Sequence, residues 1–287
     1  MKGLETYTVG MVGLGLMGGA IALALRSEGI IRTEGRILAY DRDPDTLEKA
    51  KAAGIIDDGM SVPEAMLGQC DLVFLCITPR ALLHFMENQM AAFRPGTLIT
   101  DIAGIKGSIV AAMEHTLRED LDFIPGHPMA GSELGGLAHA KSCTFQGKNY
   151  ILTPLKRNKP ENLALLKTLI YRMGFGRITE TSPQEHDRNI AFTSQLCHVI
   201  AAALIDCEAD TRITRFGGGS FEDLTRIAML NAPMWTELFI ENQEELLKRI
   251  EQFAGSLDRL KRAIAAGERT ALEQRLQAVR ERRAAMV

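Results

Sequence analysis

The first candidate for chemistry in this sequence is a histidine set among small residues and a proline. His127 lies in the run from Gly126 to Glu133, Gly-His-Pro-Met-Ala-Gly-Ser-Glu, directly after an apolar stretch that predicts a strand. A neutral imidazole, with an ordinary pKa of about 6.5, can take a proton from a hydroxyl while hydride leaves the same carbon. Ser132 and Glu133 stand in the same run, so we expect them to lie close to the same site.

A site for a hydride acceptor is predicted near the N-terminus, where an apolar strand runs into Gly-x-Gly-x-x-Gly and then into a helix. Gly13 would make the tight turn, Gly15 would let the backbone approach a pyrophosphate, and Gly18 would allow close helix–strand packing. The start of the helix points free N–H groups and its positive end at the phosphates. We therefore predict a dinucleotide site made by Gly13, Leu14, Gly15, Leu16, Met17 and Gly18.

The next predicted strand is followed by Asp41 and Arg42, which bear on the choice of cofactor. A carboxylate at Asp41 can accept hydrogen bonds from the adenosine ribose hydroxyls and repel a 2′-phosphate. This favours NAD over NADP. An arginine directly after it can hold a phosphate, so use of both cofactors stays open.

The elements that must position these residues alternate between β-like runs and amphipathic helices. The predicted strands are Thr8–Val12, Arg36–Tyr40, Asp71–Ile77, Leu98–Asp101, Phe123–Pro125 and Tyr150–Thr153. Such alternation predicts a parallel, doubly wound sheet of the Rossmann type. We expect this α/β nucleotide-binding domain to span residues 1–181, with ligands at the carboxyl ends of its strands.

From Ser182 onward helical periodicity dominates, and Ser182 and Glu185 form a predicted capping box at its start. Helices are expected at Glu185–Glu208, Phe221–Ala228 and Met234–Ala254. We predict an all-α second domain, residues 182–287, that binds substrate. Because this domain cannot easily bury all its apolar helix faces, we also expect it to pair two copies of the chain into a homodimer.

The composition is that of an ordinary globular protein. Of 287 residues, 46% are hydrophobic, and 33 basic against 36 acidic side chains leave a net charge of −3. Nothing in this balance points to nucleic acid or an anionic membrane. No run approaches the roughly 20 apolar residues of a membrane span, and the start is unlike a secretion signal, so we expect a cytoplasmic protein. Neither cysteines nor histidines show metal-site spacing, so no metal is expected.

Motifs along essentially the whole chain resemble those of the prephenate/arogenate dehydrogenase family of tyrosine biosynthesis. They are Gly13–Gly18, Thr100–Lys106, His127–Glu133, His186-Asp187, Ser194–His198, Phe221–Ala228 and Pro233–Trp235. The resemblance implies NAD-dependent removal of hydride from C4 of prephenate while carbon dioxide leaves C1, which gives 4-hydroxyphenylpyruvate. Arogenate, which has an amino group in place of the side-chain keto group, stays open as the substrate.

The resemblance also implies roles for individual residues. The substrate-binding residues would be Ser132, Glu133, Ser194, His198, Asp223 and Arg226. His127 would accept the 4-hydroxyl proton, and the guanidinium of Arg226 would bind a carboxylate through its fixed fork of donors. Glu133, Asp223 and Arg226 would form an ionic network at the entrance. From the residues alone, Arg226 could instead pair with Asp223 on a helix surface, and His198 could be a core histidine.

The chain departs from the family pattern at two important positions. Many members carry a serine where Gly104 stands, and that serine hydrogen-bonds the catalytic histidine, so a water, Ser132 or another group must orient His127. Gln195 replaces a pocket histidine, which leaves pocket polarity and substrate preference open. We interpret His186 as structural, while Lys106 could either serve the nicotinamide side or simply begin a helix.

Two other classes of protein share part of this pattern. A β-hydroxyacid dehydrogenase has a similar Gly-rich opening but places a lysine after a Gly-rich helix, and Gly217-Gly218-Gly219 is not followed by such a lysine. A non-enzymatic, NAD-sensing scaffold would carry a degraded site, whereas His127, Ser132, Glu133 and Arg226 are all present. The motifs favour the resemblance to the prephenate/arogenate dehydrogenases over both alternatives.

Overall fold

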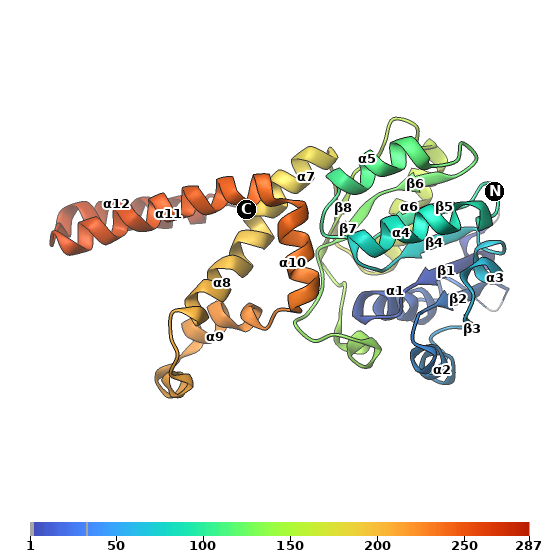
Figure 1. Cartoon of the computed structure of the whole chain (residues 1–287), viewed down its shortest axis with the longest axis horizontal. Coiled ribbons are helices and arrows are strands. Elements are labelled where there is room, and N and C mark those ends of the chain that lie inside the picture. The colour runs from blue at the N-terminus through green and yellow to red at the C-terminus, as the bar shows by residue number, and fades with distance from the viewer. Residues whose placement is uncertain (1–2, 33, 287) are drawn as a thin grey trace.

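A computed structural model describes residues 3–32 and 34–286 and divides the chain into two parts (Figure 1). The N-terminal part is a layered α/β body. The C-terminal part consists of helices that extend away from this body as two arms. The change occurs at Ser182, between the last strand and the first long helix of the C-terminal part.

The centre of the α/β body is a six-stranded parallel sheet of order β3-β2-β1-β4-β5-β6. Its strands are β1 (Thr8–Val12), β2 (Arg36–Tyr40), β3 (Asp58–Met60), β4 (Leu72–Leu75), β5 (Leu98–Asp101) and β6 (Asp122–Ile124). The strand order reverses between β1 and β4, which is the switch point where doubly wound proteins bind ligands. The predicted Rossmann-type sheet is confirmed.

Helices cover both faces of this sheet. They are α1 (Leu16–Ser27), α2 (Pro44–Ala52), α3 (Pro63–Leu67), α4 (Pro79–Gln89), α5 (Gly107–Thr116) and α6 (Pro160–Arg172). Val9 and Met11 of β1 enter one core with α1, α2 and α6, while Val12 enters the other core with α3, α4 and α5. Successive strand residues point to opposite faces, so both faces are buried and the carboxyl ends of the strands meet at one fixed edge.

A second sheet of three strands stands beside the first. It consists of β7 (Gly126–Pro128), β8 (Asn149–Leu152) and β9 (Arg177–Glu180), with β7 antiparallel and β9 parallel to β8. The prediction that Tyr150–Thr153 extends the parallel sheet is therefore wrong. Pro125 has no N–H to donate to a ladder, so β6 ends before it, and the chain turns at once into β7.

The C-terminal part is entirely helical. Its helices are α7 (Pro183–Ile190), α8 (Leu196–Asp206), α9 (Gly219–Thr225), α10 (Ala232–Glu241), α11 (Gln243–Ala265) and α12 (Arg269–Ala284). Among the residues that the structure describes, short 3-10 turns lie at Leu4–Thr6, Met90–Ala92, Leu137–Ser142, Thr211–Phe216 and Arg226–Ala228. Ser182 caps α7, since its hydroxyl accepts the N–H of Glu185 at 3.1 Å. A π-helical turn, Ala191–Gln195, joins α7 to α8.

The predicted helix Met234–Ala254 is wrong as a single helix, because the chain turns at Asn242 between α10 and α11. The Asn242 side-chain amide donates to the carbonyl of Asp187 at 3.0 Å and to Gln195 Oε1 at 2.8 Å. Gln195 in turn donates to the carbonyl of Leu238 at 3.0 Å. These bonds satisfy buried polar groups that a broken helix would otherwise leave unpaired.

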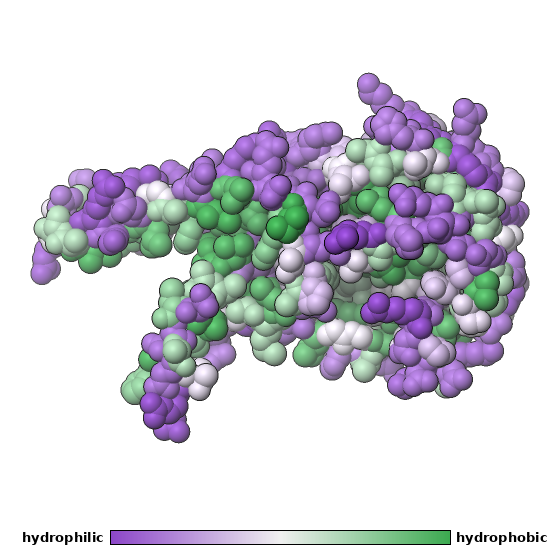
Figure 2. Space-filling view, in the orientation of Figure 1, coloured by the Kyte–Doolittle hydropathy of each residue, from purple (hydrophilic) through white to green (hydrophobic). Residues whose placement is uncertain are grey.

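Large apolar side chains remain exposed along the helical arms. Among them are Leu204, Ile205, Phe216, Leu224, Met229, Ile240, Leu247, Leu257 and Ile264. Figure 2 shows hydrophobic surface gathered where α8, α10 and α11 meet and along the inner sides of the arms. Exposed apolar side chains gathered in this way are typical of a surface that contacts another macromolecule.

One helical run, Pro183–Asp206, is long and apolar enough to cross a membrane by length and composition, which the sequence analysis did not foresee. A core or interface helix of a soluble protein passes the same test. His186, Asp187 and Gln195 of this run make hydrogen bonds to other elements of the chain. Polar groups tied to the protein itself are typical of a helix packed inside a fold or an assembly.

Candidate active site

The predicted dinucleotide loop lies at the carboxyl edge of the large sheet, between β1 and α1. Gly13 has φ +90°, and a Cβ there would lie 2.7 Å from the carbonyl oxygen of Cys76, so the turn requires glycine. A Cβ on Gly18 would overlap the carbonyl oxygen of Gly13. A Cβ on Gly15 would meet no atom within 4 Å. The open space above Gly15, next to the first N–H groups of α1, fits a pyrophosphate.

Asp41 braces this loop from the end of β2. Its Oδ2 accepts the N–H of Leu14 at 2.7 Å, and its Oδ1 accepts the N–H of Asp43 at 2.9 Å. The Leu14 side chain is buried in the core, while Leu16 and Met17 are half-buried at the start of α1. Arg42 is exposed and makes no ion pair with any residue that the structure describes. The loop is therefore held before any ligand binds.

His127 lies on β7, opposite Ile151 of β8. Its Nδ1 lies 2.9 Å from Nε2 of His186, and Nδ1 of His186 lies 2.7 Å from Oδ1 of Asp187. Nε2 of His127 makes no hydrogen bond within the described part of the chain. The interpretation of His186 as structural thus overlooked a contact between two imidazoles.

The Asp187 carboxylate is held by the first residues of α5. Its Oδ1 accepts the N–H of Lys106 at 2.8 Å, and its Oδ2 accepts the N–H of Gly107 at 2.7 Å. A carboxylate at a helix N-terminus is stabilised by the free N–H groups and by the helix dipole. This contact fixes α7 of the helical part against α5 of the α/β body.

Lys106 and Asp101 form an ion pair from which water is fully excluded. Nζ of Lys106 lies 2.5 Å from Oδ2 of Asp101 and donates to the carbonyl of Ala103 at 2.8 Å. Oδ1 of Asp101 accepts the N–H of Gly126 at 3.1 Å, at the start of β7. Lys106 does begin a helix, as the N-cap residue of α5, and its ammonium forms a buried pair with Asp101, which also binds the start of β7 just before His127.

Burial and neighbouring charge keep the histidines neutral. Burial, then His186 and Lys106, hold the pKa of His127 well below its usual range. Burial also lowers the pKa of His186, although the bond to Asp187 opposes this shift. Since protonation is disfavoured on both rings, neutral imidazoles face each other at neutral pH. A neutral His127 can act as a base.

Helix α10 closes the other side of His127. A Cβ on Gly104 would lie 3.4 Å from Cδ2 of Leu238 and 3.9 Å from Cε1 of His127. One turn earlier on α10, the ring of Trp235 stacks on His198 with centroids 3.7 Å apart. The place of the family's serine is therefore faced by an apolar side chain, and α10 connects the surroundings of His127 to those of His198.

On the helical side, His198 bonds to the backbone of Ser194. Its Nδ1 lies 2.9 Å from the Ser194 carbonyl oxygen, so Nδ1 carries the proton and Nε2 is an open acceptor. Burial lowers the pKa of His198, against the effect of this bond. Both residues are half-buried. A half-buried histidine stacked on an aromatic ring is better placed to line a pocket than to fill a core.

The predicted ionic network is present in part. Arg226 donates to Glu133 Oε2 at 3.0 Å across 93 positions of sequence. The backbone N–H of Glu133 itself and then Arg226 lower the pKa of this carboxyl. Asp223 makes no ion pair with the described residues, so neither the three-membered network nor the alternative Arg226–Asp223 pair is present. Ser132 is exposed, and its Oγ accepts the N–H of Leu134 at 2.9 Å.

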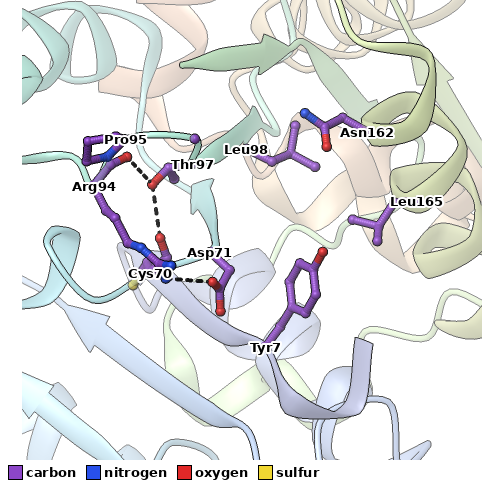
Figure 3. A pocket seen from close by; sticks show the side chains of 10 residues that line it. Tyr7, Cys70, Asp71, Arg94, Pro95, Thr97, Leu98, Asn162 and Leu165 are labelled. Atoms are coloured by element: carbon purple, nitrogen blue, oxygen red, sulfur yellow. Dashed lines mark hydrogen bonds and ion pairs between the residues drawn. The ribbon is translucent and has the colours of Figure 1, made fainter. Parts of the chain in front are cut away.

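A separate small cavity, of about 110 Å³, lies at the opposite edge of the sheet (Figure 3). Tyr7 precedes β1, Asp71 precedes β4 and Leu98 begins β5, so the cavity lies at the amino ends of the strands. Asp71 is already bound there to Arg94 at 2.7 Å. Ligands of doubly wound sheets bind at the carboxyl ends, which is where His127 and the glycine loop lie.

Comparison with known families agrees with this geometry. A family model described as the prephenate dehydrogenase nucleotide-binding domain matches residues 21–179. A second, described as the prephenate dehydrogenase dimerization domain, matches residues 182–278. The chain belongs to the prephenate dehydrogenase family. The two matched ranges meet beside Ser182, where the structure changes from α/β to all-α, and the β-hydroxyacid dehydrogenase alternative is excluded.

Characterised relatives of this family resemble the chain over nearly its full length. It is 31% identical over 271 residues to the prephenate dehydrogenase of Lactococcus lactis subsp. cremoris, covering 92% of this chain and 73% of that protein. A prephenate dehydrogenase from Aquifex aeolicus, solved in complex with hydroxyphenyl propionate and NAD+, is 32% identical, with a TM-score of 0.87 over all of both chains. The arogenate dehydrogenase of Synechocystis is 28% identical, with a TM-score of 0.78 over 98% of this chain and 100% of that one.

The structure shows what surrounds the two positions, Gln195 and Gly104, that depart from the prephenate dehydrogenase pattern. Gln195 is buried and bonds to Leu238 and Asn242, so its side chain braces the α10–α11 turn. Gly104 carries no hydroxyl, and the group bonded to the His127 ring is His186. Sequence reasoning missed this contact because 59 positions separate the two histidines. The one sequence signal for this contact was the acidic residue Asp187, which directly follows His186.

Gly15→Ala and Gly18→Ala are expected to fail in different ways. The methyl of Gly15→Ala meets no protein atom but enters the proposed pyrophosphate space, so NAD affinity should fall at least about tenfold while the melting temperature stays within about 2 °C. Gly18→Ala overlaps the Gly13 carbonyl and should lower the free energy of unfolding by about 1–3 kcal/mol. Thermal unfolding and calorimetric NAD titration measure both. Equal destabilisation of the two variants would contradict this reading of the loop.

Proposed function

We propose that this chain oxidises prephenate to 4-hydroxyphenylpyruvate and carbon dioxide, with NAD as the hydride acceptor and His127 as the base. The observation that carries the proposal is the state of His127. Its ring is neutral, its Nδ1 is bound to His186, and its Nε2 is open at the edge where the glycine loop also ends. A base at this edge is what oxidation of a secondary ring alcohol by a dinucleotide requires.

Hydride transfer and proton transfer can each be assigned to a particular group. NAD, when bound above Gly15, supplies the acceptor for the hydride from C4. His127 Nε2 takes the 4-hydroxyl proton as the hydride leaves. The electrons of the C1–carboxylate bond then complete the aromatic ring as carbon dioxide departs. His127 returns the proton to the C4 oxygen in this step. The protein's own task is therefore to hold one proton near C4 and to orient the ring.

The remaining site residues would bind the substrate's two carboxylates and its side chain. Arg226, held by Glu133, presents a charged fork to a carboxylate. Ser132 accepts a backbone N–H at its Oγ and keeps its own hydroxyl proton free to donate to the side chain. Asp223 lies one turn before Arg226 on the same segment and would join this entrance when substrate binds. Ser194 and His198 would line the far wall.

Replacing His127 tests the base directly. Steady-state rates of NADH formation, with 4-hydroxyphenylpyruvate identified as the product, are compared for the parent and His127→Asn. We expect a loss of about 10²–10⁴-fold in kcat, with NAD affinity preserved, because asparagine cannot accept a proton. A variant that turns over prephenate at the parent's rate would overturn the proposed base. No turnover by the parent would overturn the proposed substrate.

Arogenate is the second candidate substrate. It is favoured by the likeness to the Synechocystis arogenate dehydrogenase, and it differs from prephenate only in the side-chain amino group. The same site residues would serve both reactions, since C4 and the ring carboxylate are shared. Parallel assays with arogenate and NAD would then yield tyrosine. If the enzyme turns over arogenate and not prephenate, the proposed mechanism still applies and the product is tyrosine.

Asp41 should set the choice of cofactor. We expect Asp41→Ala to reduce the preference for NAD over NADP by at least about tenfold, because the variant no longer repels a 2′-phosphate and Arg42 stands next to it. The Gly13–Gly18 loop also loses its bond from Leu14 to Asp41, so NAD affinity itself should fall. The ratio of kcat/KM for the two cofactors is the readout. An unchanged ratio would contradict the role given to the Asp41 carboxylate.

The active form is proposed to be a homodimer, joined through the helical arms, in the cytoplasm. Leu246, Phe253, Leu257 and Ile264 recur at helical spacing on one face of α11. Leu246 is 4% exposed and covered by the chain itself, whereas Leu257 is 56% and Ile264 65% exposed. The stripe thus continues beyond what one chain covers, as expected where a second copy packs.

A charge placed on this stripe should separate the subunits. The double variant Leu257→Glu/Ile264→Glu is expected to sediment as a monomer, because two charges would have to be buried in an apolar contact. Arg259→Glu, exposed on the opposite side of the same helix, is the matched control and should sediment as the parent dimer. A parent that sediments as a monomer at micromolar concentration would contradict the proposed assembly.

A further inference from the structure

We propose that His186 and Asp187 form a relay with His127 that fixes which nitrogen of His127 is the base and stabilises the positive charge that the base acquires. The inference rests on the proposed function and assigns positioning roles to two residues outside the substrate-binding set. It starts from three side chains joined in series, at 2.9 Å and 2.7 Å.

The hydrogen-bond chemistry allows one arrangement of protons. The Asp187 carboxylate can only accept, so Nδ1 of His186 carries its proton. His186 is neutral, so its Nε2 has a lone pair and must accept from Nδ1 of His127. His127 is neutral too, which leaves the lone pair on its Nε2. The relay therefore places the basic nitrogen on the side of the ring that faces away from His186.

The charges around the relay suit a proton that arrives during the reaction. Lys106 and Asp101 cancel within their own buried pair, and Tyr150, whose pKa is raised by burial, is neutral. Asp187 then remains as one uncompensated carboxylate facing two neutral imidazoles. When His127 takes the substrate proton, the positive charge can spread to His186 and meets this carboxylate. The transient charge is thus paired inside a low-dielectric site.

The Asp187 end of the relay is anchored by backbone groups. Asp187 is held by the N–H groups of Lys106 and Gly107 at the start of α5, and a Cβ on Gly107 would lie only 2.9 Å from Asp187 Oδ2. On the opposite side, Gly104 offers no hydroxyl and Leu238 is apolar. Within the described residues, His186 is therefore the hydrogen-bond partner of the His127 ring.

The arrangement of protons can be read without turnover. Nitrogen-15 NMR of histidine-labelled full-length protein at neutral pH distinguishes protonated from unprotonated ring nitrogens, with His127→Asn and His186→Gln used for assignment. We expect both His127 and His186 to carry their proton on Nδ1. A His127 protonated on Nε2 would overturn the relay even if the enzyme oxidises prephenate.

Two substitutions of His186 separate its contacts. His186→Gln can place an amide oxygen near the position of Nε2 and still accept from His127, but it cannot share the charge. His186→Asn keeps a donor toward Asp187 and loses the contact with His127. We expect kcat to fall about tenfold in His186→Gln and about 10²-fold in His186→Asn, with the KM for prephenate within about threefold of the parent. If both variants change the KM equally and leave kcat unchanged, the positioning role of His186 is overturned.

The pH dependence of kcat/KM gives a readout that a merely structural role would not move. In His186→Gln the positive charge can no longer spread from His127 onto a second imidazole, so the relay predicts that the pKa of His127 falls and that the acid limb moves to lower pH. Asp187→Asn removes the negative charge that favours protonation of the pair, so its acid limb should move to lower pH. His115→Gln, exposed on α5, is the control and should leave the profile unchanged. If the parent oxidises prephenate and the acid limb of kcat/KM moves in neither variant, the relay is overturned and the proposed reaction still stands.

Discussion

The active edge of this protein depends on one carboxylate, Asp101, which is fully buried at the end of β5. It binds the ammonium of Lys106 and the backbone N–H groups of Ala103 and Gly126. A charge removed from water is costly unless all its bonds are made, and loss of one partner from such a pair costs about 3–5 kcal/mol. Because these partners begin α5 and β7, the carboxylate fixes the strand that carries His127 relative to the helix that anchors Asp187.

The two parts of the chain meet through apolar packing of α10, where Leu238 joins a core cluster of the α/β body, and through a set of polar bonds. Asp187 of α7 binds the start of α5, and Asn242 binds the backbone of Asp187 from the turn between α10 and α11. Gln195 adds a bond to Leu238, the residue that faces Gly104. These directional bonds set the distance between the base and the helical wall of the site. Such precision matters because catalysis by positioned groups is lost with small displacements.

Much of this structure could be predicted from the sequence because its signals are local. The glycine loop, Asp41 and the alternating strands lie within short windows in which turn chemistry and periodicity decide the conformation. His127 and the Glu133–Arg226 pair were reached through motifs shared with the prephenate dehydrogenase family. The loop glycines show the clearest agreement, since the steric demand on Gly13 and Gly18 is the one the pattern predicts.

What the sequence did not predict depends on contacts between distant segments. The three residues of β7 are too few to show strand periodicity, and their partner β8 lies 22 or more positions further on. The break at Asn242 has no proline or glycine to mark it, since buried bonds to Asp187 and Gln195 create it. The contact of His127 with His186 likewise exists only in the folded chain. In each case tertiary hydrogen bonds outweigh local preference.

The most direct test of the account is a crystal structure of the chain with NAD and 4-hydroxyphenylpyruvate bound. The account predicts the product's 4-hydroxyl oxygen within about 3 Å of Nε2 of His127, with the bond from Nδ1 to His186 intact. A hydroxyl bound instead to His198 or Ser132, with Nε2 of His127 facing neither product nor cofactor, would contradict the assignment of His127 as the base.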